Sequence, residues 1–245
     1  MPSYEVEAAP PLPRSGKAGL SCAGEYRSGG GGAASRHIGH ELRCAKLAPV
    51  EKSNYVTIHH FTSMSEKYKI RDSQQLYFVS FATVNWIDVF TRRLYNDIFV
   101  DSLRYCQQHK GLELYAWCLM TNHAHVIISS ATQHLPSILR DLKRHTAKSI
   151  LRAIEENTQE SRRDWMLWMF KRAGQHNAHN EQYQFWQQNN HPVELYSYEL
   201  QQQRLAYVHR NPVVAGFVDA PEDFLYSSAR NYAGQAGLLE VLFIG

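Results

Sequence analysis

The sequence predicts a mixed α/β domain, and three observations support this prediction. Short stretches rich in aromatic and β-branched residues, typical of strands, occur at residues 76–84, 112–120 and 123–130. Longer stretches at residues 88–110 and 135–157 repeat apolar residues at helical spacing. The two kinds of pattern are interspersed, which favours a sheet with helices packed on it.

The first 63 residues differ from the rest in composition. They contain a proline cluster at residues 10–13 and four glycines at 29–32, without sustained apolar periodicity. Such a segment cannot bury a core. It also lacks the continuous apolar region of a secretory signal. We therefore expect residues 1–63 to be a disordered or adventitious leader and residues 64–245 to form the folded domain.

Charge and cysteine usage limit the classes of function. Of the net charge of +3, seven basic and five acidic residues before Met64 contribute two. Any nucleic-acid binding must therefore come from local clusters of basic residues. Four cysteines without paired spacing argue against a disulfide framework and favour a reducing, cytoplasmic compartment. No stretch is long and apolar enough to span a bilayer. The cysteines are Cys22, Cys44, Cys106 and Cys118.

Each predicted core element has a local reason. Aromatic and β-branched residues make residues 76–84 the first strand. The helix at residues 88–110 is expected to end at Gly111, because glycine commonly caps helices. Thr121 and Asn122 form a short turn between the next two strands, which are therefore expected to pair as a hairpin.

The helix predicted at residues 135–157 has two different faces. Its inner stripe is mostly apolar, whereas four cations recur every four residues on the opposite side. This basic row could follow a phosphate backbone, or it could be an ordinary solvated face. The inner stripe is Leu135, Ile138, Leu139, Leu142, Thr146, Ile150 and Ala153, and the basic row is Arg140, Arg144, Lys148 and Arg152.

The downstream part is expected to add smaller elements and one long helix. A short helix is predicted at residues 160–170 and an edge strand within residues 190–195. The long helix from Tyr198 is expected to end at Asn211, because the residue before a proline is pushed out of the helical region. Residues 221–232 should form a turn and a short helix that cap the domain.

Two histidines suggest a metal site. His123 and His125 lie on a predicted strand with Ala124 between them, so both side chains point to the same side. As ligands they would supply half of a metal site on a rigid platform. Two half-buried histidines bonded to neighbouring carbonyls would give the same pattern.

A second stretch adds a phenol and an amide. Tyr207 and Asn211 are four residues apart and therefore share one helix face. Beside two imidazoles they would supply a nucleophile and an oxygen ligand. This set suits phosphodiester chemistry, in which a metal polarises the phosphate and a tyrosine attacks it. The alternative is a tyrosine that packs its ring and leaves its hydroxyl at the surface.

Four motifs, in the same order, resemble those of the HUH single-tyrosine transposases, more closely the REP-associated tyrosine transposases. They are Met120-Thr121-Asn122-His123-Ala124-His125-Val126-Ile127, Phe185-Trp186-Gln187, Ala206-Tyr207-Val208-His209-Arg210-Asn211-Pro212-Val213-Val214-Ala215-Gly216 and Tyr226-Ser227-Ser228-Ala229. The likeness runs from Met64 to about Gly234. It implies a ferredoxin-like HUH endonuclease domain with helices packed on a central antiparallel sheet.

The resemblance also implies an activity and the residues for it. The implied reaction is a metal-dependent nick in single-stranded DNA with a 5′-phosphotyrosine intermediate, and the family's substrates are hairpins of repetitive extragenic palindromes. By position, His123 and His125 match the metal-binding pair, Tyr207 the nucleophile and Asn211 the suspected third ligand. Thr121 stands where the family usually has proline, which should affect only the turn.

The implied cofactor is Mg²⁺ or Mn²⁺. Imidazoles favour softer metals than magnesium, so manganese is the compromise. The implied partner is single-stranded or hairpin DNA, with the stem on the basic row and unpaired bases on an aromatic such as Phe185 or Trp186, both also expected in the core. No membrane partner is expected, and a monomer and a homodimer both stay open.

Two other classes of function stay open. A nucleic-acid-binding protein could keep the fold without cutting DNA, although the chain retains all four candidate residues. A zinc hydrolase could use the histidines with water, but neither stretch offers a convincing carboxylate as third ligand.

Overall fold

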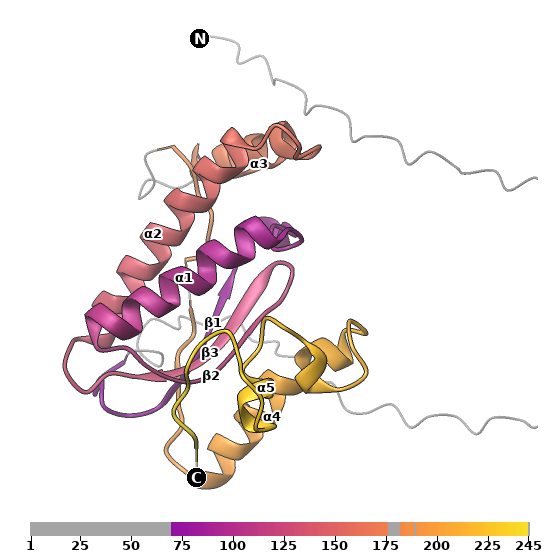
Figure 1. Cartoon of the computed structure of the whole chain (residues 1–245). Helices are drawn as coiled ribbons and strands as arrows, with labels where there is room; N and C mark the ends of the chain where they lie inside the picture. The colour runs from indigo at the N-terminus through magenta and orange to yellow at the C-terminus, as the bar shows by residue number, and fades with distance from the viewer. Residues whose placement is uncertain (1–69, 176–181, 189, 245) are drawn as a thin grey trace, which may run out of the picture. The chain divides into compact units, whose positions relative to one another are not determined.

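The computed structural model describes residues 70–175, 182–188 and 190–244 (Figure 1). The expected leader, residues 1–63 with two of the cysteines, lies outside the described residues. Within the described ranges, no helix has the length and apolar character needed to cross a membrane.

The described residues form one sheet with helices packed on it. The strands are β1 (Tyr77–Ala82), β2 (Glu113–Leu119), β3 (His123–Ser129) and β4 (Val193–Glu194). The helices are α1 (Arg93–Lys110), α2 (Leu135–Glu156), α3 (Arg163–Gln175), α4 (Tyr198–Val214) and α5 (Ala229–Tyr232), with 3-10 turns η1 (Val84–Trp86) and η2 (Pro221–Asp223).

All strand pairs in this sheet are antiparallel. The strand order is β2-β3-β1-β4, with β2 and β3 joined as the predicted hairpin and β4 at the edge next to β1. Ser80 on β1 lies opposite His125 on β3, and Ala82 lies opposite His123. The prediction of a mixed α/β domain with a central antiparallel sheet is confirmed.

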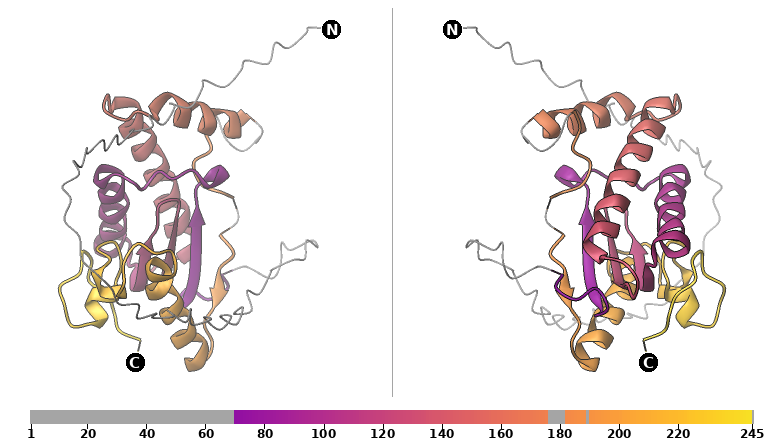
Figure 2. Two further views of the ribbon diagram at one scale, coloured as in Figure 1. Left: turned by 90° about the vertical axis from the view of Figure 1, so that its right-hand side faces the viewer. Right: turned by 90° about the vertical axis from the view of Figure 1, so that its left-hand side faces the viewer.

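The two faces of the sheet are covered by different helices. One face packs against α1, α2 and α3, whereas on the other face Phe78 and Cys118 pack against Leu205 of α4. Figure 1 shows α1 and α2 on one side of the strands and α4 on the other, and Figure 2 shows α1 beside α2. Because alternate residues of a strand point to opposite faces, His123 and His125 belong to the face that α4 covers.

The first helix begins later than predicted. α1 starts at Arg93 rather than at Asp88. Arg92 has an extended backbone (φ −121°, ψ 138°), and the N–H of Phe90 donates to the carbonyl of Thr121 at 2.8 Å, so the residues before Arg93 do not form helical hydrogen bonds. The predicted end is confirmed, since Gly111 caps the helix with a φ of 64°. The apolar spacing before Arg93 therefore reflects packing of an irregular segment rather than a helical turn.

The last long helix does not end before its proline. α4 continues through Pro212 to Val214, so the prediction that it ends at Asn211 is wrong. The ring of Pro212 is buried, and the helix closes beyond it with bonds from Ala215 N–H to the Asn211 carbonyl and from Phe217 N–H to the Pro212 carbonyl. An internal proline costs about 3 kcal/mol in a helix. We attribute its tolerance here to the burial of the ring.

The predicted inner stripe of α2 is confirmed apart from its last residue. Its first six members are buried, but at the end of the helix Ile154 is buried and Ala153 only partly so. The basic row is exposed along its whole length. A sustained helical pattern therefore predicted which face of α2 meets the sheet.

The downstream elements have the predicted types, but their bounds differ from those predicted. α3 starts at Arg163 and is longer than the predicted 160–170 helix, while β4, η2 and α5 confirm the edge strand and the capping segment. Phe185 and Trp186 are 2% and 5% exposed, so both belong to the core. Neither ring is open to a nucleobase.

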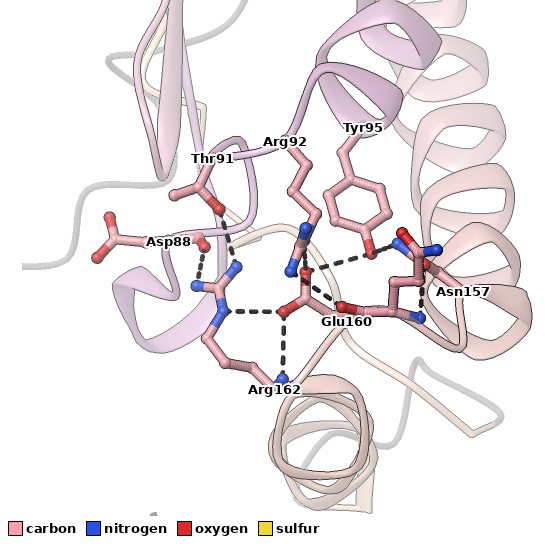
Figure 3. A network of polar contacts seen from close by, with 8 residues as sticks. Asp88, Thr91, Arg92, Tyr95, Asn157, Glu160 and Arg162 are labelled. Carbon is pink, nitrogen blue, oxygen red and sulfur yellow. Dashed lines mark hydrogen bonds and ion pairs between the residues drawn. The ribbon is translucent and has the colours of Figure 1, made fainter. Parts of the chain in front are cut away.

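A buried carboxylate joins the start of α1 to the start of α3 (Figure 3). The side chain of Glu160 is fully buried and accepts hydrogen bonds from Arg92 at 2.5 Å and Arg162 at 3.2 Å. Burial acts to raise the pKa of Glu160, but the bonds from both arginines outweigh it and the pKa is lowered. Arg162 also donates to the carbonyl of Asp88 at 2.7 Å. The network thus anchors the irregular segment before α1.

Candidate active site

The structure places the phenol beside the histidine pair. The hydroxyl oxygen of Tyr207 lies 3.5 Å from Nε2 of His125. The ring centroids of His123 and His125 are 4.8 Å apart. Tyr207 is 46% exposed while His125 is 6% exposed, so the phenol is the member of this group that a large substrate meets first.

Asn211 lies at the same place. It follows Tyr207 by one turn of α4, and a hydrogen bond with its side chain acts on the pKa of His123. The four residues that the sequence singled out therefore meet on one face of the sheet. β3 supplies the two imidazoles, and α4 supplies the phenol and the amide.

One ring nitrogen of each histidine is bonded by a neighbour. Nδ1 of His125 lies 2.8 Å from Oγ of Ser80, and Nδ1 of His123 lies 2.7 Å from Oδ1 of Asn122. Such bonds fix the orientation of an imidazole and favour the tautomer that leaves the other nitrogen free to bind a ligand. Nε2 is thus the nitrogen that each ring offers to the site.

Burial keeps the two imidazoles neutral. It lowers the pKa of His125 to about 3, and the charges of His123 and Arg204 act in the same direction. Burial also lowers the pKa of His123, against the opposing effects of Asn211 and of the charge of Asp88. Neutral imidazoles keep the lone pair that a metal ion requires. Both rings therefore have the protonation state of ligands.

This donor set fits a divalent cation. Two imidazole nitrogens and the amide oxygen of Asn211 would supply three ligands and leave positions for water or phosphate. Among the described residues, no three His, Cys, Asp or Glu side chains gather into a potential metal site. The zinc hydrolase alternative therefore gains no carboxylate ligand in this part of the chain.

An aspartate supports His123 through the turn. Oδ1 of Asp88 accepts hydrogen bonds from Nδ2 of Asn122 at 2.9 Å and from Oγ1 of Thr121 at 2.6 Å. Asn122 is also the residue that contacts His123. Thr121 does more than shape the turn, contrary to the prediction, because its hydroxyl ties the turn to the segment before α1. No local pattern indicates that residues 88 and 122 meet.

Sequence reasoning also missed Arg204. Its guanidinium carbon lies 5.1 Å from the ring centroid of Phe78 and 6.0 Å from that of Tyr207. Phe78 in turn stacks on His125, with centroids 5.4 Å apart. Nε of Arg204 is buried and has no hydrogen-bond partner within the described residues. The signal that could have found it is its position three residues before Tyr207, on the same helix face.

The basic row of α2 lies apart from this group. α2 packs on the sheet face opposite to α4. Arg140 and Arg152 also have acidic partners, since Arg140 pairs with Asp141 at 3.4 Å and Arg152 with Glu156 at 2.7 Å. A DNA contact made by the row stays a prediction.

Comparison with known families bears on this geometry. Residues 73–171 match the family described as "Transposase IS200 like". This match to a transposase family agrees with the resemblance that the motifs indicate. The match includes His123 and His125 and supports a DNA-processing enzyme of the transposase kind. It ends before Tyr207 and Asn211, so the roles of these two residues are argued from the geometry of this chain.

The solved structures that match the chain include two transposases. One is described as a REP-associated tyrosine transposase bound to a REP hairpin; it is 15% identical, with a TM-score of 0.48 over 74% of this chain and 94% of that chain. The other is a putative transposase from Deinococcus radiodurans R1, 18% identical, with a TM-score of 0.35 over 58% of this chain and 93% of that chain. No curated protein matches the chain.

Proposed function

We propose that this chain is a metal-dependent transposase that nicks and rejoins hairpin-bearing single-stranded DNA through a 5′-phosphotyrosine intermediate. The observation that carries the proposal is the 3.5 Å approach of the Tyr207 hydroxyl to His125. That approach puts a potential nucleophile beside two neutral imidazoles. The family match supports the transposase function, and the chemistry is inferred from the side chains.

The proposed cation site consists of His123, His125 and Asn211. Ser80 and Asn122 would hold the two imidazoles in the orientation that presents Nε2. A divalent cation bound there, Mg²⁺ or Mn²⁺, would polarise the scissile phosphate as a Lewis acid. Because two of the three protein ligands are imidazole nitrogens, manganese is the ion to test first.

In the proposed cleavage step, the phenol oxygen of Tyr207 forms a bond to the scissile phosphorus. The bond from phosphorus to the 3′-oxygen of the adjoining nucleotide breaks, and that oxygen takes up a proton and leaves as a 3′-hydroxyl. The phenol proton passes to water, which reaches the half-exposed ring. Arg204, whose guanidinium carbon lies 6.0 Å from the Tyr207 ring centroid, would bind the phosphate oxygens as negative charge gathers on them.

Rejoining reverses the same exchange. The 3′-hydroxyl of another strand end attacks the phosphotyrosine, and the phenol oxygen of Tyr207 leaves. One phosphodiester bond is made for each phosphotyrosine bond broken, so no external energy source is needed. The same residues would therefore serve both cutting and strand transfer.

The test is a search for the covalent adduct. Labelled single-stranded DNA hairpins are incubated with the protein and Mn²⁺, and the products are separated on a denaturing gel. We expect Tyr207→Phe to bind the hairpins and form no adduct, because the phenyl ring has no attacking oxygen. Tyr196→Phe, at a tyrosine that is 81% exposed, is the matched control and should form the adduct as the unaltered chain does.

Two outcomes would contradict the proposal. An adduct that persists in Tyr207→Phe would assign the nucleophile to another residue. An unaltered chain that shifts hairpins on a native gel but forms no adduct with Mn²⁺ or Mg²⁺ would favour a nucleic-acid-binding protein that does not cut.

A further inference from the structure

One exposed aromatic side chain borders the histidine pair and has no part in the proposed reaction. Trp86 is 57% exposed, and its ring centroid lies 5.9 Å from that of His123. Among the described residues whose rings contact the two histidines, Phe78 is buried, whereas Trp86 and Tyr207 are open to solvent. Because the core encloses Phe185 and Trp186, Trp86 is the indole that a DNA base could reach beside the site.

The backbone of Trp86 has a conformation that residues other than glycine rarely adopt. Asn85 and Trp86 both have a φ of 54°, which is uncommon for a bulky residue such as tryptophan. The Trp86 N–H donates to the carbonyl of Thr83 at 3.1 Å, and its carbonyl accepts from Nδ2 of Asn122 at 3.3 Å. These contacts, rather than burial of the indole, fix the position of Trp86.

The same contacts set the position of Trp86 relative to the histidines. Asn122 bonds the Trp86 carbonyl through its amide nitrogen and His123 through its amide oxygen. A row of rings results, in which consecutive centroids from Trp86 through His123 and His125 to Tyr207 are 5.9, 4.8 and 5.1 Å apart. The indole contacts one imidazole and the phenol contacts the other, so a phosphate held by the two histidines would lie near both.

We propose that Trp86 is a stacking platform for an unpaired nucleobase next to the scissile phosphate. This proposal rests on the proposed function, since it needs a DNA strand at the histidine pair. An indole face accepts any base, because every base has a π-face. Trp86 would therefore hold the strand in register for attack without selecting its sequence.

The experiment measures binding without chemistry, in a Tyr207→Phe background. The probe is the DNA hairpin with unpaired flanks that this variant binds most tightly in a selection from a random library. Trp86→Asn removes the ring and keeps a residue that tolerates a positive φ, while Trp86→Phe keeps an aromatic face. We expect Trp86→Asn to weaken binding by about 5- to 150-fold, the range measured for base stacking, and Trp86→Phe to retain most of the affinity.

An abasic scan of the same hairpin then locates the stacked base. At one unpaired position, removal of the base should weaken binding to the protein that keeps Trp86 by the same factor as the Trp86→Asn substitution. Removal of that base should not weaken binding to the Trp86→Asn variant any further. Such non-additivity is expected only for partners in contact. Tyr105→Ala, at a tyrosine on α1 that is 54% exposed, should leave the scan unchanged.

The proposal is overturned if the two losses add at every unpaired position, or if Trp86→Phe binds as weakly as Trp86→Asn. Thermal unfolding of each variant checks that the fold is kept. The adduct test separates this inference from the proposed function. If the losses add but the unaltered chain forms the adduct, the stacking proposal is wrong and the proposed cleavage stands. If the losses are coupled but the unaltered chain forms no adduct, the stacking proposal stands and the proposed cleavage is wrong.

Discussion

Ser80 and Asn122 contact the imidazoles but take no part in the bonds that form and break in the proposed reaction. Each contacts Nδ1 of one histidine. Ser80 belongs to β1, and Asn122 belongs to the turn before β3. Ser80 reaches His125 because β1 pairs with β3, whereas Asn122 precedes His123 in the chain. The site therefore depends on a register between strands as well as on the residues of one motif.

Arg204 gives a prediction at the same scale. Arg204→Gln removes a cation beside the phenol, where negative charge would gather on the phosphate. We expect the rate of adduct formation to fall about 10²- to 10³-fold, as for the loss of one oxyanion donor, with a smaller effect on hairpin binding. Single-turnover rates at saturating DNA give the comparison.

Arg210→Gln is the control for this prediction, since Arg210 is an exposed arginine of the same helix. It should change the rate little. Equal rate losses in both variants would mean that Arg204 acts only through the general charge of α4.

The elements show which parts of the fold a sequence pattern can predict. The strands and α2 have strong periodicity over their length, and their kind and faces follow from it. The start of α1 and the end of α4 depend instead on contacts between distant residues. Asp88 accepts a hydrogen bond from the β2–β3 turn, and the ring of Pro212 is buried. No local propensity encodes either feature.

The segment before α1 gives a prediction for an element. Glu160→Gln keeps the shape of the side chain but removes the charge that Arg92 and Arg162 share. Because Glu160 is buried and the two arginines are partly exposed, we expect a loss of about 1–3 kcal/mol in the free energy of unfolding, measured with urea. Adduct formation should also slow, since the network holds the segment that carries Asp88.

Glu156→Gln is the matched control. Glu156 pairs with Arg152 on the surface of α2, where the side chains are 62% and 75% exposed. Solvent screens such an exposed pair, so its loss should change the free energy of unfolding little. Similar losses for the two variants would show that the buried network adds nothing beyond a surface ion pair.

For the whole molecule, the candidate site joins two distant parts of the chain. Motif resemblance predicted His123, His125, Tyr207 and Asn211, because each belongs to a short recognisable stretch. The same reasoning did not find Asp88, Arg204 or Trp86, whose proposed roles rest on contacts that the motifs do not show. A sequence indicates which residues carry the chemistry more readily than which residues position them.

The basic row gives a prediction at this scale. If the hairpin stem contacts α2, the double variant Arg144→Gln with Lys148→Gln should weaken hairpin binding. It should also reduce the slope of log affinity against log salt by about 2, because two fewer counterions are released. Adduct formation at saturating DNA should be unchanged, since the row lies on the other face of the sheet from Tyr207.

Lys171→Gln with Arg172→Gln, two exposed cations of α3, is the control for this measurement. A salt slope that does not differ between the row variant and the unaltered chain would identify the row as a solvated helix face.

The opposite placement of α2 and α4 has a consequence for the path of the nucleic acid. A straight duplex resting on one side of the molecule could touch either the cations of α2 or the phenol of α4. To reach both, the DNA would have to wrap around the rim of the sheet, with its bend at the junction between stem and unpaired flank. The width of the sheet would then set the shortest hairpin that the protein can process.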